Sequence, residues 1–479
     1  MIWIEIDKTK KLPLIRQVYQ QLRSKILNGQ LKSGDKLPSS RELAIFLHIS
    51  RNVILEAYNL LLLEGYIISK PSIGTFVAEG ILLDNTLTTP SQNFSSSLLS
   101  KNSISNEKTI DFRSGIPALD LFPLKKWYTL ESQLALETSP NCFDYGTPQG
   151  TPELRTSICT YLQRTRGLIC DPSQIIITSG SIQSFSLLSK LLLTQDTSYI
   201  IEDPLHYEIR KTFETTCINH YSVPVDEQGI LTAFLPENIN PSFIFVTPSH
   251  QYPLGGLLSI QRRIELIRYA EEKNCYIIED DYDSEFHYLG SPVSALYDLA
   301  PNRVIYVGTF SKILSPSLRI GYMILPYELV DCICEYKKRS DYFTNTLNQL
   351  LLSKFIDNMY LNKHILKMRK LYFKRHNTLI ESLLSTFDNS VTIQGESTGL
   401  HLIAMFKHVE FTEPLIKFLY QNGVAIYPIW IHSLRKDYPK NSIILGYSHL
   451  SCEMIQKGIT LLKENLIVWY NQIDSNNNG

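Results

Sequence analysis

Hydrophobic residues near the start of the chain recur with the period of an α-helix. In residues 14–27 apolar side chains return every three or four positions, and the same spacing appears again in two shorter segments. Gly29 and Gly65 follow the first and the last of these segments, and glycine commonly ends a helix. The pattern predicts three helices, over about residues 14–27, 40–47 and 51–64.

The predicted second and third helices each begin at a serine. Ser39 and Glu42 have the spacing of a capping box, in which each side chain satisfies a backbone amide of the first turn. Ser50 is placed to cap the third helix. Residues 67–77 read as two short strands around a turn at Gly74, and the first seven residues also alternate as a strand does. Two short helices joined by a tight turn, followed by such a hairpin, indicate a winged helix-turn-helix.

After residue 110 the pattern changes to short, continuously apolar runs separated by helical patterns. Strands that are apolar throughout, with helices between them, predict a mostly parallel sheet covered on both faces. In such a sheet ligands bind at the carboxyl ends of the strands. The predicted strands are Ile175–Thr178, Tyr199–Ile201, Phe243–Val246, Tyr276–Glu279, Val304–Val307 and Gly321–Leu325.

Between these two regions the apolar pattern disappears. Ser, Thr and Asn dominate the segment, which is typical of a flexible linker. The sequence therefore predicts a helix-turn-helix domain over residues 1–78, a linker over 79–109 and a large domain over 110–479.

Composition agrees with a soluble protein of more than one domain. The chain has 479 residues, of which 44% are hydrophobic and 19% charged, and this length exceeds what one hydrophobic core supports. No secretory signal is visible, so a cytoplasmic location is expected. Residues 1–80 hold 11 Lys and Arg against 7 Asp and Glu, a net +4 in a chain whose total is −1. A basic head on an acidic body suits a module that faces phosphates.

Three polar clusters follow predicted strands of the large domain. Thr178–Gln183 is a loop of small residues leading into a helix that we expect to begin near Ser184, and its amides could hold a phosphate. Glu279–Phe286 contains five carboxylates, which fit either a metal site or a carboxylate paired with a protonated pyridine nitrogen. No histidine pair at ligand spacing supports the metal alternative.

The third cluster is Thr309–Lys312, followed by Arg319. A desolvated lysine near other cations has a lowered pKa and can form a Schiff base with an aldehyde. A lone lysine is most often a surface residue. Here three clusters in chain order indicate one ligand, a phosphorylated aldehyde with a pyridine ring.

The N-terminal region resembles the winged helix-turn-helix domain of GntR-type bacterial regulators. The resemblance rests on Leu37–Ala44, Ser50–Asn52, Ala57–Tyr58, Glu64–Tyr66 and Gly74–Val77, which occur in the order of that family. It implies binding to a double-stranded DNA operator. The positions that it implies for DNA contact are Arg41, Ser50, Arg51, Asn52, Lys70 and Gly74.

The large domain resembles fold-type I aminotransferases, which use pyridoxal 5′-phosphate (PLP). By this resemblance Lys312 is the catalytic lysine that joins the cofactor, Asp280 pairs with the pyridine nitrogen and Tyr282 bonds the ring hydroxyl. Further cofactor-binding positions implied are Ser179, Gly180, Ser181, Thr309 and Arg319 at the phosphate, and His206 or Tyr207 stacked on the ring.

Together the two halves resemble MocR-type regulators. The implied fold is an all-α/β winged helix-turn-helix head plus an α/β fold-type I aminotransferase-like domain, with a mostly parallel sheet and a smaller C-terminal α/β subdomain. The implied protein is a PLP-dependent transcriptional regulator that senses an amine, an amino acid or PLP itself, and that forms a head-to-tail homodimer. An active aminotransferase with an appended DNA-binding domain is the alternative.

The chain departs from the GABA-sensing members of this group at two positions. Glu208 and the region of Lys440 stand where those members place arginines. Lysine cannot make the two-pronged contact that arginine makes with a carboxylate. The sequence therefore disfavours a GABA or dicarboxylate effector and favours a regulator over a working enzyme.

Overall fold

The computed structural model describes residues 4–9, 12–79, 109–288, 294–395 and 399–477. The chain divides into two compact units, Met1–Ile104 and Ser105–Gly479, and each is described by itself. The predicted linker over residues 79–109 lies, apart from its two ends, outside the described residues. None of the described helices is long and apolar enough to cross a membrane.

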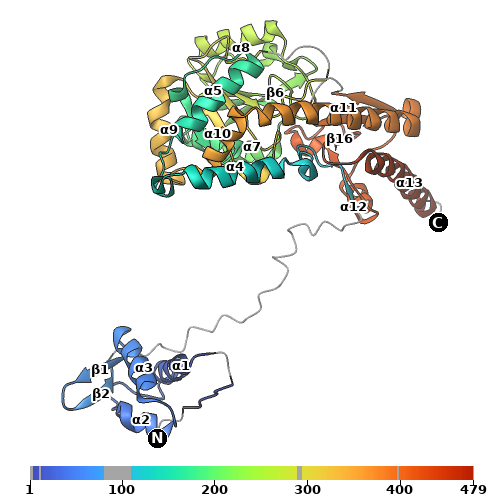
Figure 1. Ribbon diagram of the computed structural model, residues 1–479. Helices are drawn as coiled ribbons and strands as arrows, with labels where there is room; N and C mark the ends of the chain where they lie inside the picture. The colour runs from blue at the N-terminus through green and yellow to red at the C-terminus, as the bar shows by residue number, and fades with distance from the viewer. Residues whose placement is uncertain (1–3, 10–11, 80–108, 289–293, 396–398, 478–479) are drawn as a thin grey trace. The chain divides into compact units, whose positions relative to one another are not determined.

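The first unit is a three-helix bundle with a two-stranded wing (Figure 1). Val18, Leu22, Ile54 and Leu61 are fully buried between the helices, as the helical spacing requires. The two strands pair antiparallel, from Ile67 opposite Val77 to Lys70 opposite Gly74. The elements are α1 (Leu14–Leu27), α2 (Ser40–Phe46), α3 (Arg51–Leu63), β1 (Ile67–Lys70) and β2 (Gly74–Val77).

Two local expectations for this unit are met only in part, and residues 1–3 of the alternating segment lie outside the described residues. The Ser39 capping box is present, but the hydroxyl of Ser50 accepts no hydrogen bond although Ser50 does precede α3. Residues 4–7 form no strand. Their backbone pairs instead with side chains of α1, because Gln17 and Gln21 each exchange two hydrogen bonds with that segment.

The second unit is built on an eight-stranded sheet, and all six predicted strands are confirmed. Its order is β4-β11-β10-β9-β8-β5-β6-β7, and β11 runs antiparallel to both of its neighbours. The strands from β10 through β6 are mutually parallel, so their carboxyl ends share one edge. The strands are β4 (Ile175–Thr178), β5 (Tyr199–Asp203), β6 (His220–Asp226), β7 (Gly229–Ile230), β8 (Phe243–Val246), β9 (Tyr276–Asp281), β10 (Val304–Thr309) and β11 (Gly321–Ile324).

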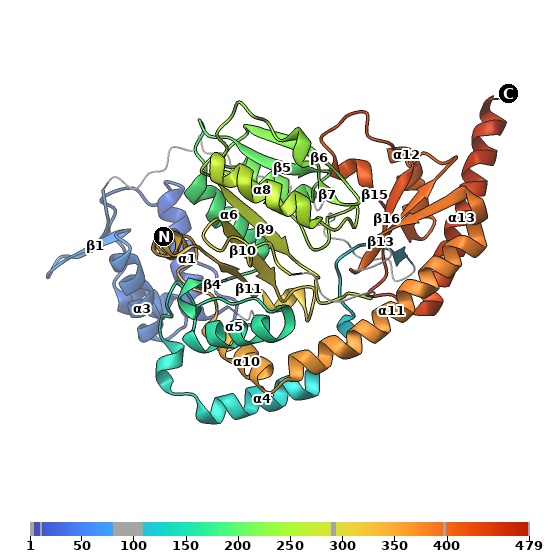
Figure 2. The ribbon, with the colours of Figure 1, turned by 90° about the horizontal axis from the view of Figure 1, so that it is seen from above.

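Helices cover both faces of this sheet (Figure 2). Alternate strand residues enter opposite cores, for example Ile277 on one face and Ile278 on the other. One face packs against α4 (Leu124–Glu137), α5 (Pro152–Arg166), α8 (Ile260–Glu272) and α10 (Thr346–Asp357). The other packs against α6 (Ser181–Leu192), α7 (Tyr207–Glu214) and α9 (Tyr327–Ser340). Helix α6 begins at Ser181 rather than near Ser184, because Gly180 makes the turn with a φ of 100°.

A smaller subdomain follows the long helix α11, which packs against α13 (Figure 2). Its antiparallel sheet has the order β12-β13-β16-β15, and β14 pairs in parallel with β3 (Ile110–Asp111), the first described strand of the unit. Its elements are α11 (Tyr360–Phe387), β12 (Val391–Gln394), β13 (His401–Phe406), α12 (Glu413–Gln421), β14 (Val424–Ala425), β15 (Tyr427–Pro428), β16 (Ser442–Gly446) and α13 (Cys452–Asn477).

Candidate functional site

A cavity of ≈ 220 Å³ lies at the carboxyl ends of the central parallel strands. Lys312 follows β10 and Asp280 lies near the end of β9, where Val307 pairs with Asp280. The turn between β4 and α6 meets the same place. Among the residues predicted from the sequence, the cavity is lined by Gly180, Ser181, His206, Asp280, Tyr282, Thr309, Lys312 and Arg319.

Two predicted residues are not brought into this cavity. The backbone amide of Ser179 donates to the side chain of Gln183 at 2.6 Å, and Ser179 is not among the lining residues. Tyr207 is exposed and lines a separate groove of the smaller subdomain. Of His206 and Tyr207, only His206 lines the cavity.

Lys312 lies in a site that favours its neutral amine. Burial lowers the pKa of Lys312, and the carboxylates of Asp283 and Asp280 only partly oppose this effect. Its ammonium nitrogen sits close to the backbone of Gly115, where an added Cβ would lie 2.7 Å from Nζ. Only glycine leaves room for the lysine there. A neutral primary amine in a cavity can add to a carbonyl group.

Asp280 has a buried acceptor without a partner. The residue is 5% exposed, and its Oδ1 has no hydrogen-bond partner. Burial raises the pKa of Asp280 well above its usual range, and Asp281 raises it further. An unpaired buried carboxylate oxygen costs free energy unless a ligand supplies a donor or a cation. Asp280 can therefore pair with a protonated ring nitrogen.

The opposite end of the cavity is suited to an anion. Arg319 lies at its rim with Gly180, and a Cβ on Gly180 would lie 3.2 Å from Nη1 of Arg319. Ser181 begins α6, whose amino end attracts negative charge. The hydroxyl of Thr309 donates to Ser311 at 3.1 Å, which adds two hydroxyls to the same wall. These groups could hold a phosphate.

Several lining residues were not predicted from the sequence. The hydroxyls of Ser114 and Tyr252 lie 3.1 Å apart, and the ring centroids of Tyr252 and His206 are 5.1 Å apart. The pKa of His206 is lowered to about 4 by burial, so this ring is neutral at pH 7. The unpredicted polar residues of the cavity are Ser114, Thr247, Tyr252, Asp283, Ser311 and His401.

Glu208 and Lys440 lie outside the cavity. Glu208 is exposed on the first turn of α7. Lys440 is also exposed, and its ammonium lies 5.7 Å from the ring centroid of Trp430 in the separate groove. Neither side chain lines the cavity.

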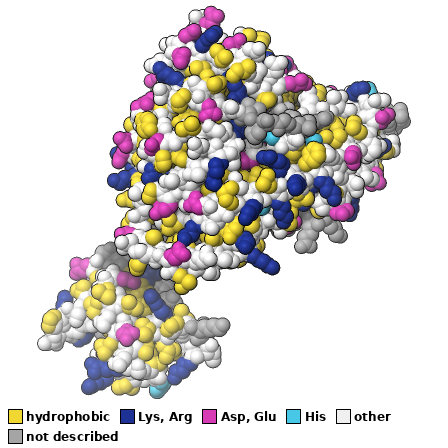
Figure 3. Space-filling model, turned by 45° about the horizontal axis from the view of Figure 1, so that its top comes forward, with side chains coloured by type: hydrophobic (Ala, Val, Ile, Leu, Met, Phe, Trp, Pro, Cys, Tyr) yellow, Lys and Arg dark blue, Asp and Glu magenta, His cyan; other side chains and the backbone are white. Residues whose placement is uncertain are grey.

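The predicted DNA-contacting side chains are exposed on the first unit. Arg51 and Asn52 begin α3, and Arg51 lies 3.3 Å from the hydroxyl of Ser40. Arg41, His48 and Arg51 line one shallow depression. Lys and Arg side chains gather at the end of the unit that also shows its histidine (Figure 3). Ser50 and Lys70 are exposed as well, and Gly74 begins β2 with a φ of 137°.

Comparisons with known proteins match both units. Residues 14–77 match the model of bacterial regulatory proteins of the gntR family, and residues 107–440 match that of aminotransferase class I and II. A protein named as an uncharacterized HTH-type transcriptional regulator, YhdI of Bacillus subtilis, is 37% identical over 96% of this chain and 97% of its own length. The probable rhizopine catabolism regulatory protein MocR of Rhizobium meliloti is 31% identical over 96% of this chain and 94% of its own.

Solved structures resemble the second unit. The kynurenine aminotransferase of Pyrococcus horikoshii, crystallised in complex with PMP, is 25% identical, with a TM-score of 0.70. The match covers 78% of this chain and 96% of that one. The prediction of a fold-type I aminotransferase fold is thereby confirmed.

Proposed function

Because the chain belongs to the MocR-type regulators of the GntR family, and is thus a DNA-binding transcriptional regulator with an aminotransferase-like domain, we propose that this domain binds PLP and senses an amine or PLP itself. The observation that carries the proposal is the buried, unpartnered Oδ1 of Asp280 in the same cavity as Lys312. One end of the cavity thus has an acceptor for a ring cation, and Lys312 supplies an amine.

The remaining cavity residues fit the same cofactor. Arg319, Ser181 and Thr309 would hold the phosphate, and the ring of His206 would lie against the pyridine face. Tyr282 lines the cavity but its hydroxyl lies 3.0 Å from the backbone oxygen of His250. Tyr252 is a second phenol within the cavity. The hydroxyl of Tyr252 is paired with that of Ser114, and Tyr282 stays the proposed partner of the ring hydroxyl.

When bound, PLP supplies an electrophilic carbon that reacts with primary amines. The residues of this chain then prepare the exchange. Lys312 would hold the cofactor, and its lowered pKa favours the neutral amine that it would become when another amine takes its place. Asp280 would keep the ring nitrogen protonated, and Arg319 would hold the phosphate end. In this proposal the freed side chain of Lys312 would be the signal.

The charges of the cavity favour an amine over a second carboxylate. Arg319 would be used by the phosphate and Lys312 by the cofactor carbon. The other lining residues that the structure describes, Asp283 and His401 among them, include no arginine or lysine. None offers the two-pronged cationic contact that carboxylates prefer. The proposed effector is therefore a small amine or an amino acid whose carboxylate is not held by an arginine of the described cavity, or PLP.

DNA recognition is assigned to the exposed amino end of α3. Arg and Asn are side chains with the geometry to contact guanine and adenine. Arg51 and Asn52 would read base edges, Arg41 and Lys70 would contact phosphates, and Gly74 would let the wing approach the backbone. We propose a head-to-tail homodimer, whose two heads would read paired half-sites of one operator.

An absorbance titration of the purified full-length protein tests the cofactor assignment. With PLP, the wild type should show the visible band of cofactor joined to a lysine, and a reactive amine should shift it. Lys312→Ala should lack this band, whereas Lys338→Ala, at an exposed lysine of α9, should keep it. Retention of the band by Lys312→Ala would refute the assignment. Sustained turnover with a keto acid would instead support an enzyme.

A binding assay with operator DNA tests the assignment of the head. Arg51→Ala should weaken binding by about 1–3 kcal/mol, which is roughly 5- to 150-fold in Kd, if it contacts a base. Lys312→Ala should leave DNA affinity without effector close to that of the wild type. If Lys312→Ala abolishes DNA binding while Arg51→Ala does not, the division of roles between the two units is wrong.

A further inference from the structure

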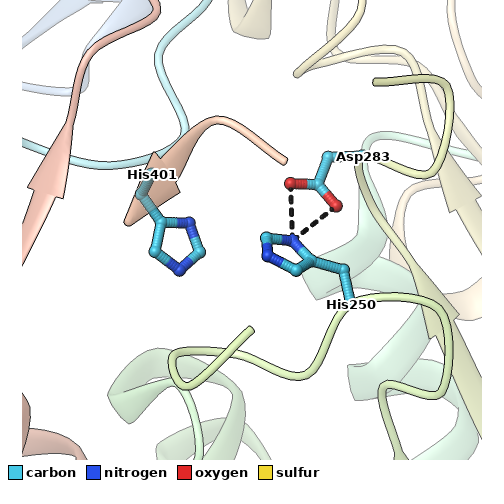
Figure 4. A group of neighbouring side chains, drawn as sticks. All are labelled: His250, Asp283 and His401. Carbon is cyan, nitrogen blue, oxygen red and sulfur yellow. Dashed lines mark hydrogen bonds and ion pairs between the residues drawn. The ribbon is translucent and has the colours of Figure 1, made fainter. Parts of the chain in front are cut away.

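Three buried polar side chains meet beside the proposed cofactor cavity, although they are far apart in the sequence (Figure 4). His250 follows β8, Asp283 follows β9 and His401 begins β13 of the smaller subdomain. Their exposed fractions are 3%, 1% and 2%. One nitrogen of each histidine and one carboxylate oxygen of Asp283 lie within 4.8 Å of one another.

The ring of His250 is oriented by Asp283. Its Nδ1 lies 3.1 and 3.0 Å from the two carboxylate oxygens, which can only accept, so the Nδ1–H group donates to Asp283. The hydroxyl of Tyr282 also lies 3.0 Å from this Nδ1, and it donates to the backbone oxygen of His250. A neutral imidazole then carries its lone pair on Nε2. This Nε2 is buried and has no hydrogen-bond partner. The backbone of Gly399 fixes the ring, since a Cβ there would lie 2.0 Å from Cε1 of His250.

The ring of His401 is oriented in the same manner by a backbone carbonyl. Its Nε2 lies 2.9 Å from the oxygen of Pro253 and donates to it, so the lone pair of the neutral ring is on Nδ1. Figure 4 shows the two imidazoles with nitrogen-bearing edges turned toward one another. The ring centroids are 5.1 Å apart. The lone pairs of the two neighbouring neutral rings are thus assigned to Nε2 of His250 and Nδ1 of His401.

This is the arrangement of metal-binding histidines. Such residues donate one ring N–H to a carboxylate or a backbone carbonyl and present the other nitrogen to the ion. The lone pair on Nε2 of His250 is a buried acceptor without a hydrogen-bond partner, which costs free energy, and a cation beside it would remove that cost. The imidazole ligands and their geometry suit zinc, copper, nickel or cobalt.

We propose that His250 Nε2 and His401 Nδ1 bind a divalent transition-metal ion, with Asp283 orienting His250. Asp283 and His401 also line the cavity, so the remaining coordination positions of the ion face it. An amine or carboxylate of a bound small molecule could complete the coordination. The ion would then link the small subdomain, through His401, to the loops of the large sheet. This site does not depend on the cofactor proposal.

Titration of the chelator-treated, full-length protein with Co²⁺ tests the site, because cobalt with nitrogen ligands has a visible spectrum. The wild type should bind one Co²⁺ per chain, and Zn²⁺ should displace it. His250→Ala and His401→Ala should each weaken binding at least about tenfold, and Asp283→Asn should weaken it about 10- to 100-fold. His432→Ala is the matched control, since His432 lies across Tyr252 from His401, and it should bind within about twofold of the wild type.

Circular dichroism and thermal melting show which variants are folded. If an alanine variant does not fold, the Co²⁺ affinity of Asp283→Asn tests the site in its place. The proposal is refuted if the wild type binds no Co²⁺ at millimolar concentration. It is refuted equally if folded His250 and His401 variants bind Co²⁺ as the wild type does, as they would if cysteines held the ion. A ¹⁵N spectrum that shows His250 doubly protonated at pH 7, and that Co²⁺ does not change, would also refute the proposal. It would mean that a proton, and not an ion, lies on Nε2 of His250.

Discussion

Replacement of Arg166 by methionine should destabilise the large unit strongly. Nη2 of Arg166 lies 3.1 Å from Oδ2 of Asp281, and both side chains are 3% exposed. Asp281 also accepts hydrogen bonds from Ser284 and Tyr306. Burial lowers the pKa of Arg166, but Asp281 and the other acidic groups nearby, Tyr306, Glu279 and Glu285, together hold the pKa above its usual value. Among the described partners of this carboxylate, the guanidinium is thus the only positively charged group in contact with it.

The expected cost of Arg166→Met is about 3–5 kcal/mol, because it leaves the carboxylate buried without a counter-charge. The double variant Arg166→Met with Asp281→Asn should cost less than Arg166→Met alone, since it removes both charges. The pair itself need not be stabilising: Nε and Nη1 of Arg166 have no hydrogen-bond partner. The control is Arg339→Met, whose partner Glu335 is 58% exposed, and it should cost less than about 1 kcal/mol.

Urea unfolding of the full-length chain, followed by tryptophan fluorescence, measures these costs. Three of the four tryptophans lie in the large unit, so the signal reports mainly on that unit. A cost of Arg166→Met below about 1 kcal/mol would refute the argument, because a buried carboxylate would then tolerate the loss of its cation. A double variant as unstable as the sum of the two single variants would show that the residues do not interact.

Three further changes test other parts of the structure. Gly180→Val should weaken PLP binding at least about tenfold, since its Cβ would crowd the arginine of the anion site. Gly167→Ala, with no atom near its Cβ, should not weaken it, and a PLP titration measures both affinities. Burial raises the pKa of Glu202 to about 7, so the contribution of Glu202 to the free energy of unfolding should fall by about 3 kcal/mol as pH rises from 4.5 to 7. Urea unfolding of Glu202→Gln at several pH values should lack this contribution. Ser39→Ala should cost the head about 1 kcal/mol, and Ser50→Ala only a few tenths, as measured by hydrogen exchange of head peptides in the full-length chain.

The sequence predicted the elements and the part of the site that follows strands directly. Lys312 and Asp280 could be found because each ends or follows a continuously apolar run, and parallel strands bring their carboxyl ends together. The motifs of the head were equally local. Residues 4–7 misled because an alternating pattern also suits an extended segment whose amides pair with glutamine side chains.

The unpredicted residues of the site have no local signature. His250 and His401 are separated by about 150 positions, and His401 belongs to a strand of another sheet. Spacing rules for metal ligands detect histidines on one helix or one loop, so they could not detect this pair. The choice between His206 and Tyr207 was also beyond the sequence. It depends on which of two neighbouring residues faces inward where α7 begins.

The cavity lies close to the chain segment that follows the predicted linker. Gly115 lies against Lys312, only five residues after the strand β3 begins at Ile110. This segment is held by the small subdomain, since Ile110 donates to Gly423 and Gly446 donates to Phe112. Under the proposals made above, an effector that moves Lys312, or draws His401 toward the large sheet, would act on the segment that follows the predicted linker. A ligand can shift DNA binding only by preferring one position of that segment.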